Sequence, residues 1–428
     1  MVDIDYHAWP LATWLDYIER QHPVAWDLGL ARVGTVADRL NVRAPAPLVL
    51  TVAGTNGKGS TTTAIEHFLI ALGLKTGATF SPHLFEFNER IRLDGKEVDD
   101  EAICAAFVAI ESVRGETSLT YFEYAMLAAF WSFKRAKVDA AVIEVGLGGR
   151  LDASNIADAD VAVVTSVDLD HQDYLGPDRE TIGAEKVAIA RVGRPVILGE
   201  RNPPQSVLDG AATLGAQLVR RDHDFAMRET PAGFHFTCGD YGIECGVKPR
   251  LALDNVAAAL AAVVACGFAP NRLQVEQAMS QAWIQGRMQT IDAKVPVIVD
   301  VAHNPHGAAF FAASLATRDS NRASTVARRS HCVLGTLADK DAPGIISALK
   351  NVVDRWYCVS TVGARGFPGD RLQALIVHQC PDQSVATFAT VADALQIVLA
   401  EAVEGDRVLV CGCFQVAGHA LQALGAAQ

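Results

Sequence analysis

Apolar runs alternate with amphipathic stretches along most of the chain, which is typical of an α/β protein. The run Leu48 to Val52 predicts a buried strand, followed by a glycine turn and a helix from about Gly59 to Leu72. Ala140 to Glu144 and Val161 to Thr165 predict further strands that end in polar residues. Because open α/β sheets bind ligands at the carboxyl ends of their strands, we expect a site at this edge.

The middle of the chain departs from this rhythm. Arg221 to Val247 alternates over short runs with glycines between them, which predicts antiparallel hairpins. Two helices are then predicted, from Asp254 to Cys266 and from Leu273 to Trp283.

A second α/β unit begins near Val295, and we place the domain boundary near Ala293. The predicted domains are therefore residues 1–293 and 294–428. The polar stretch from Arg318 to Arg329 predicts a surface loop. Further strand-like runs of the second unit begin at His331, Trp356 and Arg407.

Composition and charge narrow the class of protein. The 428 residues, half of them hydrophobic, suffice for two or three domains with large cores. A formal net charge of −12 disfavours a nucleic-acid partner. The longest apolar run, Val256 to Ala269, is shorter than the roughly 20 residues of a membrane span. The N-terminal residues lack the features of a signal peptide.

The cysteines point to a reducing compartment. The nine cysteines are scattered, odd in number and without a CxxC pair, which predicts reduced, buried thiols in a cytoplasmic protein. Cys411 and Cys413 lie in a strand-like run, and strand packing explains them better than a metal site.

A glycine-rich segment joins the first strong strand to the next helix. Its glycines allow backbone N–H groups to converge on phosphate oxygens, and the helix N-terminus adds a favourable dipole. The strict Walker pattern fails, because Val52 replaces its first glycine and Gly59 follows Lys58. An ordinary glycine turn with a surface lysine is the alternative, but the strand–turn–helix context favours a phosphate loop. The segment is Ala53-Gly54-Thr55-Asn56-Gly57-Lys58-Gly59-Ser60.

The run GTNGKGS, with glycine after the lysine, resembles the phosphate loop of the folate branch of the Mur ligases. Five further segments fit the bacterial bifunctional dihydrofolate synthase/folylpolyglutamate synthases in order, so the resemblance spans nearly the whole chain. It implies a P-loop-containing, Mur-ligase-like N-terminal domain and a smaller, Rossmann-like α/β domain. The segments are Ser81-Pro82-His83-Leu84 with Asn88-Glu89-Arg90-Ile91, Thr120-Tyr121-Phe122-Glu123, Glu144-Val145-Gly146-Leu147-Gly148-Gly149-Arg150-Leu151-Asp152-Ala153, Leu169-Asp170-His171 with Glu185-Lys186, and Asp300-Val301-Ala302-His303-Asn304-Pro305.

The resemblance implies that Ser81, Glu144 and His171 bind Mg²⁺. It also implies that Lys186 carries a carbamate and helps to hold a second magnesium ion. Mg²⁺ usually takes a few oxygen ligands from the protein besides phosphates and water, which suits Glu144 and Ser81. From the residues alone, four simpler roles stay open: a turn serine at Ser81, a capping carboxylate at Glu144, a hydrogen-bonded buried histidine at His171, and an exposed helical lysine at Lys186.

The resemblance also implies a pterin site. An aromatic face suits stacking on a flat pterin ring. From the residues alone, Tyr121 and Phe122 equally fit the core-facing side of a helix. The implied residues are Asp27, Leu28 and Gly29, then Thr120, Tyr121, Phe122 and Glu123, and finally Leu151, Asp152 and Ala153.

ATP contacts are implied in both domains. Gln285 stands where the family often has a proline, so a surface role for Arg287 is the alternative. His303 is expected to organise the catalytic site rather than to transfer protons. By resemblance, the ATP contacts are Thr55, Asn56, Gly57, Lys58, Gly59, Ser60, Asn255, Arg287 and Asp300.

These expectations describe a monomeric ligase that takes ATP, L-glutamate, dihydropteroate and reduced folates, with no nucleic-acid or membrane partner. Two rivals are a Mur-type ligase of another substrate and a P-loop binding protein without activity. The chain before Leu48 is too short for the separate substrate domain that Mur-type ligases usually carry. Near the C-terminus Gln415 replaces a histidine of the family and cannot titrate as histidine would. Folylpolyglutamate synthase activity alone is the closest alternative.

Overall fold

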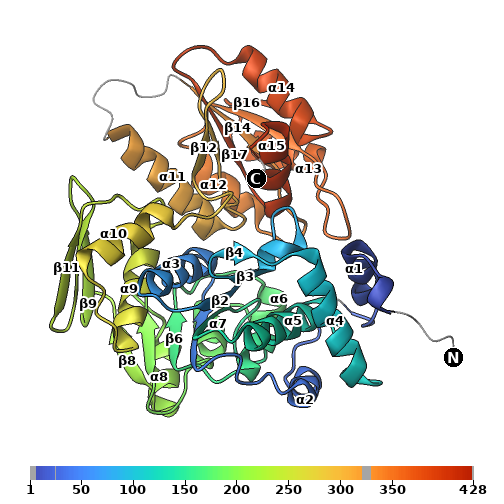
Figure 1. Cartoon of the computed structure of the whole chain (residues 1–428). Coiled ribbons are helices and arrows are strands. Elements are labelled where there is room, and N and C mark those ends of the chain that lie inside the picture. Colours follow the sequence, from blue (N-terminus) through green and yellow to red (C-terminus); the bar gives the residue numbers. More distant parts are fainter. Residues whose placement is uncertain (1–5, 25, 321–328, 427–428) are drawn as a thin grey trace. The chain divides into compact units, whose positions relative to one another are not determined.

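The computed structural model describes residues 6–24, 26–320 and 329–426. The chain divides into two compact units, of which the first ends at Ile284 and the second begins at Gln285 (Figure 1). This division lies before Ala293 because β12 (Gln289–Ile291) pairs with β13 (Val297–Val299) and so belongs to the sheet of the second unit.

An eight-stranded sheet with the order β4-β3-β2-β5-β1-β6-β7-β8 forms the centre of the first unit. Six strands run parallel to one another, namely β2, β5, β1, β6, β7 and β8. Strands β3 and β4 add an antiparallel edge beside β2. The strands are β1 (Leu48–Ala53), β2 (Thr76–Thr79), β3 (Ile91–Leu93), β4 (Lys96–Glu97), β5 (Ala140–Glu144), β6 (Val161–Val164), β7 (Pro195–Leu198) and β8 (Gln217–Arg220).

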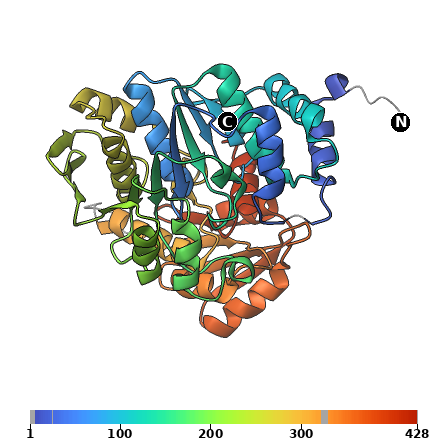
Figure 2. The same ribbon diagram turned by 90° about the horizontal axis from the view of Figure 1, so that it is seen from below.

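Helices cover both faces of this sheet, as Figure 2 shows. Side chains alternate along β1: Leu50 and Val52 pack on the face that also includes α3 and α9, whereas Val49 packs with α4 and α5. The helices of the first unit before residue 215 are α1 (Leu11–Glu19), α2 (Ala31–Leu40), α3 (Lys58–Ala71), α4 (Asp100–Arg114), α5 (Tyr121–Ala136), α6 (Gln172–Leu175), α7 (Arg179–Val187) and α8 (Gln205–Thr213), with short 3₁₀ turns η1 (Tyr6–Ala8), η2 (Phe87–Arg90) and η3 (Ala153–Ile156).

The predicted hairpins form a separate three-stranded antiparallel sheet of β9 (Phe225–Glu229), β10 (Phe234–Cys238) and β11 (Tyr241–Cys245). Helices α9 (Leu253–Ala265) and α10 (Arg272–Gln281) follow and share a core with this sheet and with α3. Both predicted helices are confirmed to within a few residues.

The second unit has a six-stranded sheet in the order β12-β13-β17-β14-β15-β16, in which only β12 among the described strands is antiparallel to its neighbour. Its further strands are β14 (Ser330–Leu334), β15 (Arg355–Val359), β16 (Ser384–Phe388) and β17 (Arg407–Cys411). Its helices are α11 (Pro305–Ser320), α12 (Ala342–Leu349), α13 (Gly369–Gln379), α14 (Val391–Glu401) and α15 (Phe414–Ala423). The predicted α/β class of both units is confirmed.

The predicted loop from Arg318 to Arg329 is wrong at its start. Helix α11 continues to Ser320, because the guanidinium of Arg318 donates to Thr290 Oγ1 (3.1 Å) and to the carbonyl of Met288 (3.3 Å). Residues 321–328 lie outside the described residues. Within the described ranges, no helix has the length and apolar character that crossing a membrane requires.

Candidate active site

The glycine-rich loop lies at the carboxyl end of β1 and is tied to the end of the neighbouring strand β6. The backbone N of Thr55 donates to the carbonyl of Ser166 (2.8 Å), and the backbone N of Asn56 donates to Ser166 Oγ (3.1 Å). Thr165 Oγ1 donates to the carbonyl of Asn56 (2.7 Å). The hydroxyls of Thr165 and Ser166 therefore fix a loop in which three of the eight residues are glycine.

Gly57 and Lys58 begin helix α3. Gly57 has a φ of 87°, and a Cβ there would lie 2.4 Å from Asn255 Oδ1, so the position requires glycine. This contact places Asn255, a predicted ATP residue of α9, against the loop. Lys58 Nζ donates to the carbonyls of Gly54 (2.9 Å) and Thr55 (3.4 Å), which holds its charge over the loop.

Glu144 and Ser81 lie together at the same edge of the sheet. Glu144 is the last residue of β5 and is 5% exposed, and its Oε2 accepts a hydrogen bond from the backbone N of Ser81 (3.0 Å). A Cβ on Gly59 would lie 3.6 Å from Glu144 Oε2, so the carboxylate faces the first turn of α3. A carboxylate and a hydroxyl beside a phosphate loop are oxygen donors that fit Mg²⁺.

His171 follows β6 and immediately precedes α6. It adopts a left-handed backbone conformation, and its side chain is 22% exposed. Its Nε2 lies 4.0 Å from Asp170 Oδ1, and its ring lies 5.9 Å from that of Trp26. His171 is therefore a partly exposed residue of the strand-end region rather than a histidine buried in the core.

Lys186 lies on α7 and is buried, with 3% of the residue exposed. Burial, followed by the positive charge of Lys58, lowers the pKa of Lys186 to about 7. Asp170 and Asp152 oppose this shift. Lys186 is thus not an exposed helical lysine, and much of its amine is neutral near pH 7.

The turn that begins at Glu144 is locked to the helix that carries Lys186. A Cβ on Gly149 would lie 2.6 Å from the carbonyl of Glu185, so only glycine permits this close approach. The backbone N of Arg150 donates to that carbonyl (2.9 Å), and its guanidinium pairs with the Glu185 carboxylate (2.9 Å). The turn and helix α7, which are distant in sequence, are therefore held firmly together.

Asp152, a predicted pterin residue, has a structural role within that turn. It is 1% exposed, and its carboxylate accepts hydrogen bonds from the backbone N of Leu147 (2.8 Å) and of Ser154 (2.9 Å). Burial raises the pKa of this carboxyl group. Ala153 is the first residue of η3, which contacts α2 and α5, and Leu151 lies just before the N-cap residue Asp152.

Arg32 joins two of the predicted pterin segments, and no sequence motif had indicated it. Its guanidinium pairs with Asp27 Oδ2 (2.6 Å) and with Glu123 Oε1 (3.2 Å). Glu123 is 3% exposed and also forms a capping box with Thr120 at the start of α5. Burial raises the pKa of Glu123, and the backbone N–H of Thr120 and the charge of Arg32 oppose that rise. Arg32 therefore holds the segment from Asp27 to Gly29 against α5.

The two aromatic residues at the start of α5 face different partners. The ring of Phe122 packs on Gly146, where a Cβ would lie 2.5 Å from it. The ring of Tyr121 lies 5.6 Å from the guanidinium carbon of Arg90. Both side chains are partly buried, so they combine packing with an accessible aromatic surface.

The predicted residues of the second unit gather at the carboxyl end of β13. Asp300 follows this strand and accepts hydrogen bonds from the backbone N of Met288 (2.8 Å) and Ala302 (2.9 Å). Arg287 Nη1 lies 4.0 Å from Asp300 Oδ1, and its guanidinium carbon lies 5.4 Å from the ring of Phe414. Burial raises the pKa of Asp300.

His303 lies by the same aromatic ring, and the centroid of its imidazole ring is 5.9 Å from the centroid of the Phe414 ring. Gln415, the residue that departs from the family pattern, accepts a hydrogen bond at Oε1 from the backbone N of Val362 (2.9 Å). Gln415 thus links the start of α15 to the loop after β15.

No group of three or more His, Cys, Asp or Glu side chains in a metal-binding arrangement occurs among the described residues. The predicted metal set does not depend on such a group, since it includes the hydroxyl of Ser81 and a modified Lys186.

Both parts of the chain match domains of Mur ligases. Residues 52–263 match the Mur ligase middle domain, and residues 286–414 match the Mur ligase glutamate ligase domain. The dihydrofolate synthase/folylpolyglutamate synthase of Escherichia coli strain K12 is 44% identical over 98% of this chain and 96% of its own length. The chain belongs to the dihydrofolate synthase/folylpolyglutamate synthase family.

Two solved structures are similar over their whole length. FolC of E. coli in complex with DHPP and ADP has a TM-score of 0.93 and 43% identity, and the match covers 98% of this chain and 99% of that chain. A bifunctional folylpolyglutamate synthase/dihydrofolate synthase with Mn, AMPPNP and L-glutamate bound has a TM-score of 0.90 and 41% identity, with 98% and 99% covered.

Proposed function

We propose that this chain is an ATP-dependent ligase that joins L-glutamate to dihydropteroate, forming dihydrofolate, and to reduced folates, forming polyglutamates. The observation that carries the proposal is the carboxyl edge of the first sheet. At this edge the phosphate loop and the Ser81–Glu144 pair follow parallel strands, and the buried Lys186 packs beside them. The chain also resembles bifunctional relatives over almost its whole length.

The reaction has two steps. A carboxylate oxygen of the acceptor attacks the γ-phosphorus of ATP, the bond to the bridging oxygen breaks, and ADP leaves with the electron pair. The amine of L-glutamate then attacks the carbonyl carbon of the acyl phosphate, loses a proton, and expels phosphate. The backbone N–H groups of the loop and Lys58 bind the β- and γ-phosphates and stabilise the charge that develops on them.

Magnesium is the expected cofactor, and relatives with Mn and a nucleotide support divalent metal use. Glu144 and Ser81 would hold the ion near the phosphate loop, with His171 as a further ligand and carbamylated Lys186 at a second ion. Bound Mg²⁺ would offset the phosphate charge.

The burial of Lys186 supports the carbamate. A neutral lysine amine adds to carbon dioxide, whereas an ammonium ion cannot, and burial favours the neutral form. The product replaces a positive charge with oxygen donors, which are the ligands that magnesium prefers.

Both acceptors are expected to support turnover. ADP release should require L-glutamate together with dihydropteroate, and equally L-glutamate together with a reduced folate, because the predicted pterin segments lie side by side around α5. The measurement is coupled ADP release with each substrate omitted in turn. Turnover with the reduced folate alone would instead identify a folylpolyglutamate synthase.

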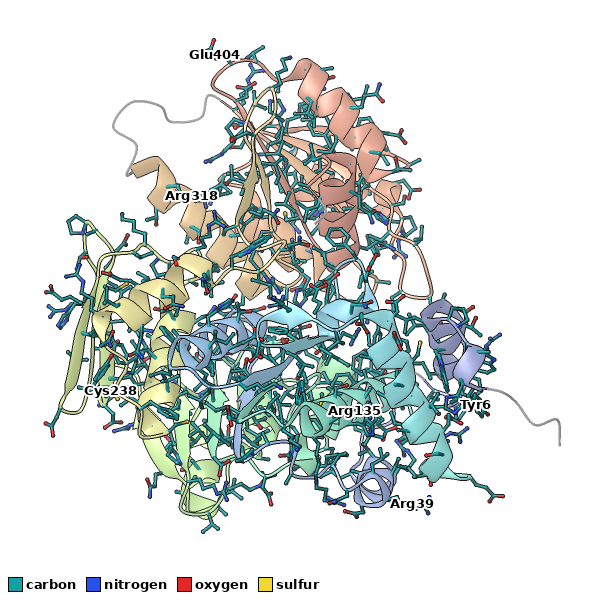
Figure 3. All side chains as sticks on the ribbon, viewed as in Figure 1. Tyr6, Arg39, Arg135, Cys238, Arg318 and Glu404 are labelled. Carbon is teal, nitrogen blue, oxygen red and sulfur yellow. The ribbon has the colours of Figure 1, made fainter. Side chains whose placement is uncertain are left out.

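Replacing Arg32 with methionine is expected to raise the KM for the acceptor by roughly tenfold, because the substitution removes charged hydrogen bonds that hold Asp27 against α5. The KM values for ATP and L-glutamate should not change. Arg39, which is labelled in Figure 3, is a matched control on the same helix. Its guanidinium also forms hydrogen bonds, but it donates them to the backbone carbonyls of Val113 and Arg114. An equal effect of Arg32→Met on all three KM values would contradict a role confined to the acceptor.

We also propose that the ligase acts as a monomer in the cytoplasm. The described cysteines are all free thiols, as expected in a reducing compartment. Light scattering during size-exclusion chromatography tests the oligomeric state, and a dimer would contradict the proposal.

A further inference from the structure

The segment between β2 and β3 is held in place by its own side chains. The carboxylate of Glu89 accepts hydrogen bonds from three successive backbone N–H groups, at 2.6–2.8 Å. Asn88 Nδ2 donates to Asp100 Oδ1 (2.9 Å), which ties the segment to the start of α4. Arg90, which follows Glu89 in the chain, therefore projects from an ordered backbone. The three N–H groups belong to Leu84, Phe85 and Glu86.

Arg90 is held at one end only. Its Nε donates to His83 Nδ1 (2.7 Å), and its guanidinium carbon lies 5.8 Å from the ring of Phe87 and 5.6 Å from that of Tyr121. In the part of the chain that the structure describes, neither terminal amino group of Arg90 has a hydrogen bond or an ion pair with the protein. The guanidinium is thus oriented but retains two unused donor groups.

The surroundings of Arg90 favour a negatively charged ligand. Burial lowers the pKa of Arg90, and the negative charge of the nearby Glu144 carboxylate opposes that shift. A guanidinium nevertheless keeps its charge at any physiological pH. Arg90 is half-buried, and an anion that accepts from both terminal amino groups would give these charged donors hydrogen-bond partners that the described residues do not supply.

Arg90 lies beside residues from both halves of the proposed site. Arg90 packs against Tyr121, which belongs to the predicted pterin segment. It also interacts electrostatically with Glu144, which belongs to the predicted metal set. The acceptor's carboxylate must lie between the pterin ring and the γ-phosphate in order to attack it. The guanidinium fork of arginine matches a carboxylate with two parallel hydrogen bonds.

We propose that Arg90 binds the reacting carboxylate of the acceptor through its two terminal amino groups and directs one oxygen towards the γ-phosphorus. This assignment rests on the proposed function. When that oxygen forms its bond to phosphorus and ADP departs, the negative charge moves onto the phosphoryl group. Arg90 keeps its contact with the second carboxylate oxygen, which becomes the carbonyl oxygen of the acyl phosphate.

The test compares dihydropteroate with its neutral carboxamide, in which an NH2 group replaces one carboxylate oxygen and the negative charge is lost. Binding of each to the full chain is measured by calorimetry in the presence of AMPPNP and Mg²⁺. Arg90→Met is expected to weaken dihydropteroate binding by roughly 30-fold and to leave carboxamide binding unchanged. Arg90→Lys, which keeps the charge but not the fork, should recover part of the loss.

Arg135 provides the matched control. Its guanidinium carbon lies 5.1 Å from the ring of Trp131 on the exposed side of α5, so Arg135→Met also removes an arginine that packs on an aromatic ring (Figure 3). This variant should bind both ligands as the unchanged protein does. Thermal melting of each variant separates lost binding from lost folding, and Arg90→Lys serves if Arg90→Met does not fold.

Two results would overturn the assignment alone. Equal weakening of both ligands would show that Arg90 only supports the loop, and loss of AMPPNP binding with unchanged acceptor binding would assign it to the γ-phosphate. If the unchanged protein bound neither dihydropteroate nor a reduced folate, the proposed function would fail together with this assignment.

Discussion

Alanine in place of Lys58 is expected to abolish turnover while the protein stays folded. The Lys58 amine lies over the phosphate loop, where it donates to the carbonyls of Gly54 and Thr55. A contact of this kind matters most when charge moves between the phosphates, so kcat should fall by roughly 100-fold or more. The loss of two partly solvent-exposed hydrogen bonds should cost only about 1 kcal/mol of stability.

The measurement is kcat for ADP release alongside thermal melting. Lys75→Ala is the matched control, because Lys75 Nζ also donates to a backbone carbonyl, that of Ala136 (2.6 Å), but lies on the exposed surface away from the loop. This control should retain kcat. Near-normal kcat in folded Lys58→Ala protein would show that the loop does not bind ATP as proposed.

Lys186 is expected to carry a carbamate. Replacing Lys186 with alanine is therefore expected to remove activity. The residue is 3% exposed, and burial lowers its pKa to about 7 with a further contribution from Lys58. Because the neutral amine is the reactive form and its share rises as pH increases through this pKa, carbamylation should increase between about pH 6 and pH 8.

Carbon-13 NMR of protein equilibrated with labelled bicarbonate and Mg²⁺ measures the carbamate directly. The carbamate signal should persist in Lys75→Ala and be lost in Lys186→Met, which fills the buried site with an apolar side chain of similar size. Short carboxylates are expected to restore part of the activity of Lys186→Ala by supplying the missing oxygen ligand. A plain ammonium group at Lys186 in a well-ordered, metal-loaded structure would refute the proposal.

Local signals in the sequence were sufficient for most of the fold. The runs at Leu48 and Ala140 are continuous and apolar, and buried parallel strands require such runs on both faces. The hairpins from Arg221 to Val247 show period-two alternation with glycines at the turns. The end of α11 was missed because Arg318 is polar, yet its contacts with Thr290 and Met288 extend the helix.

From the sequence, residues were assigned to the candidate site only where they lie in contiguous motifs. The phosphate loop and the turn that begins at Glu144 carry glycines at the close approaches to Asn255 and Glu185, so their residue types reveal their geometry. Arg32 and Arg90 carry no such signal. What distinguishes them is the partners they meet, and those partners lie far away in the sequence.

The sequence by itself determined the α/β class, the glycine-rich turn between β1 and α3, and the family, because each depends on residues that are neighbours in the chain. Only the tertiary structure decided that Lys186 is buried, that Asp152 shapes a turn, and that the terminal amino groups of Arg90 have no hydrogen bond or ion pair among the described residues. Burial and hydrogen-bond satisfaction depend on which distant segments pack together, and a lysine or arginine looks the same in the sequence whether it is exposed or enclosed.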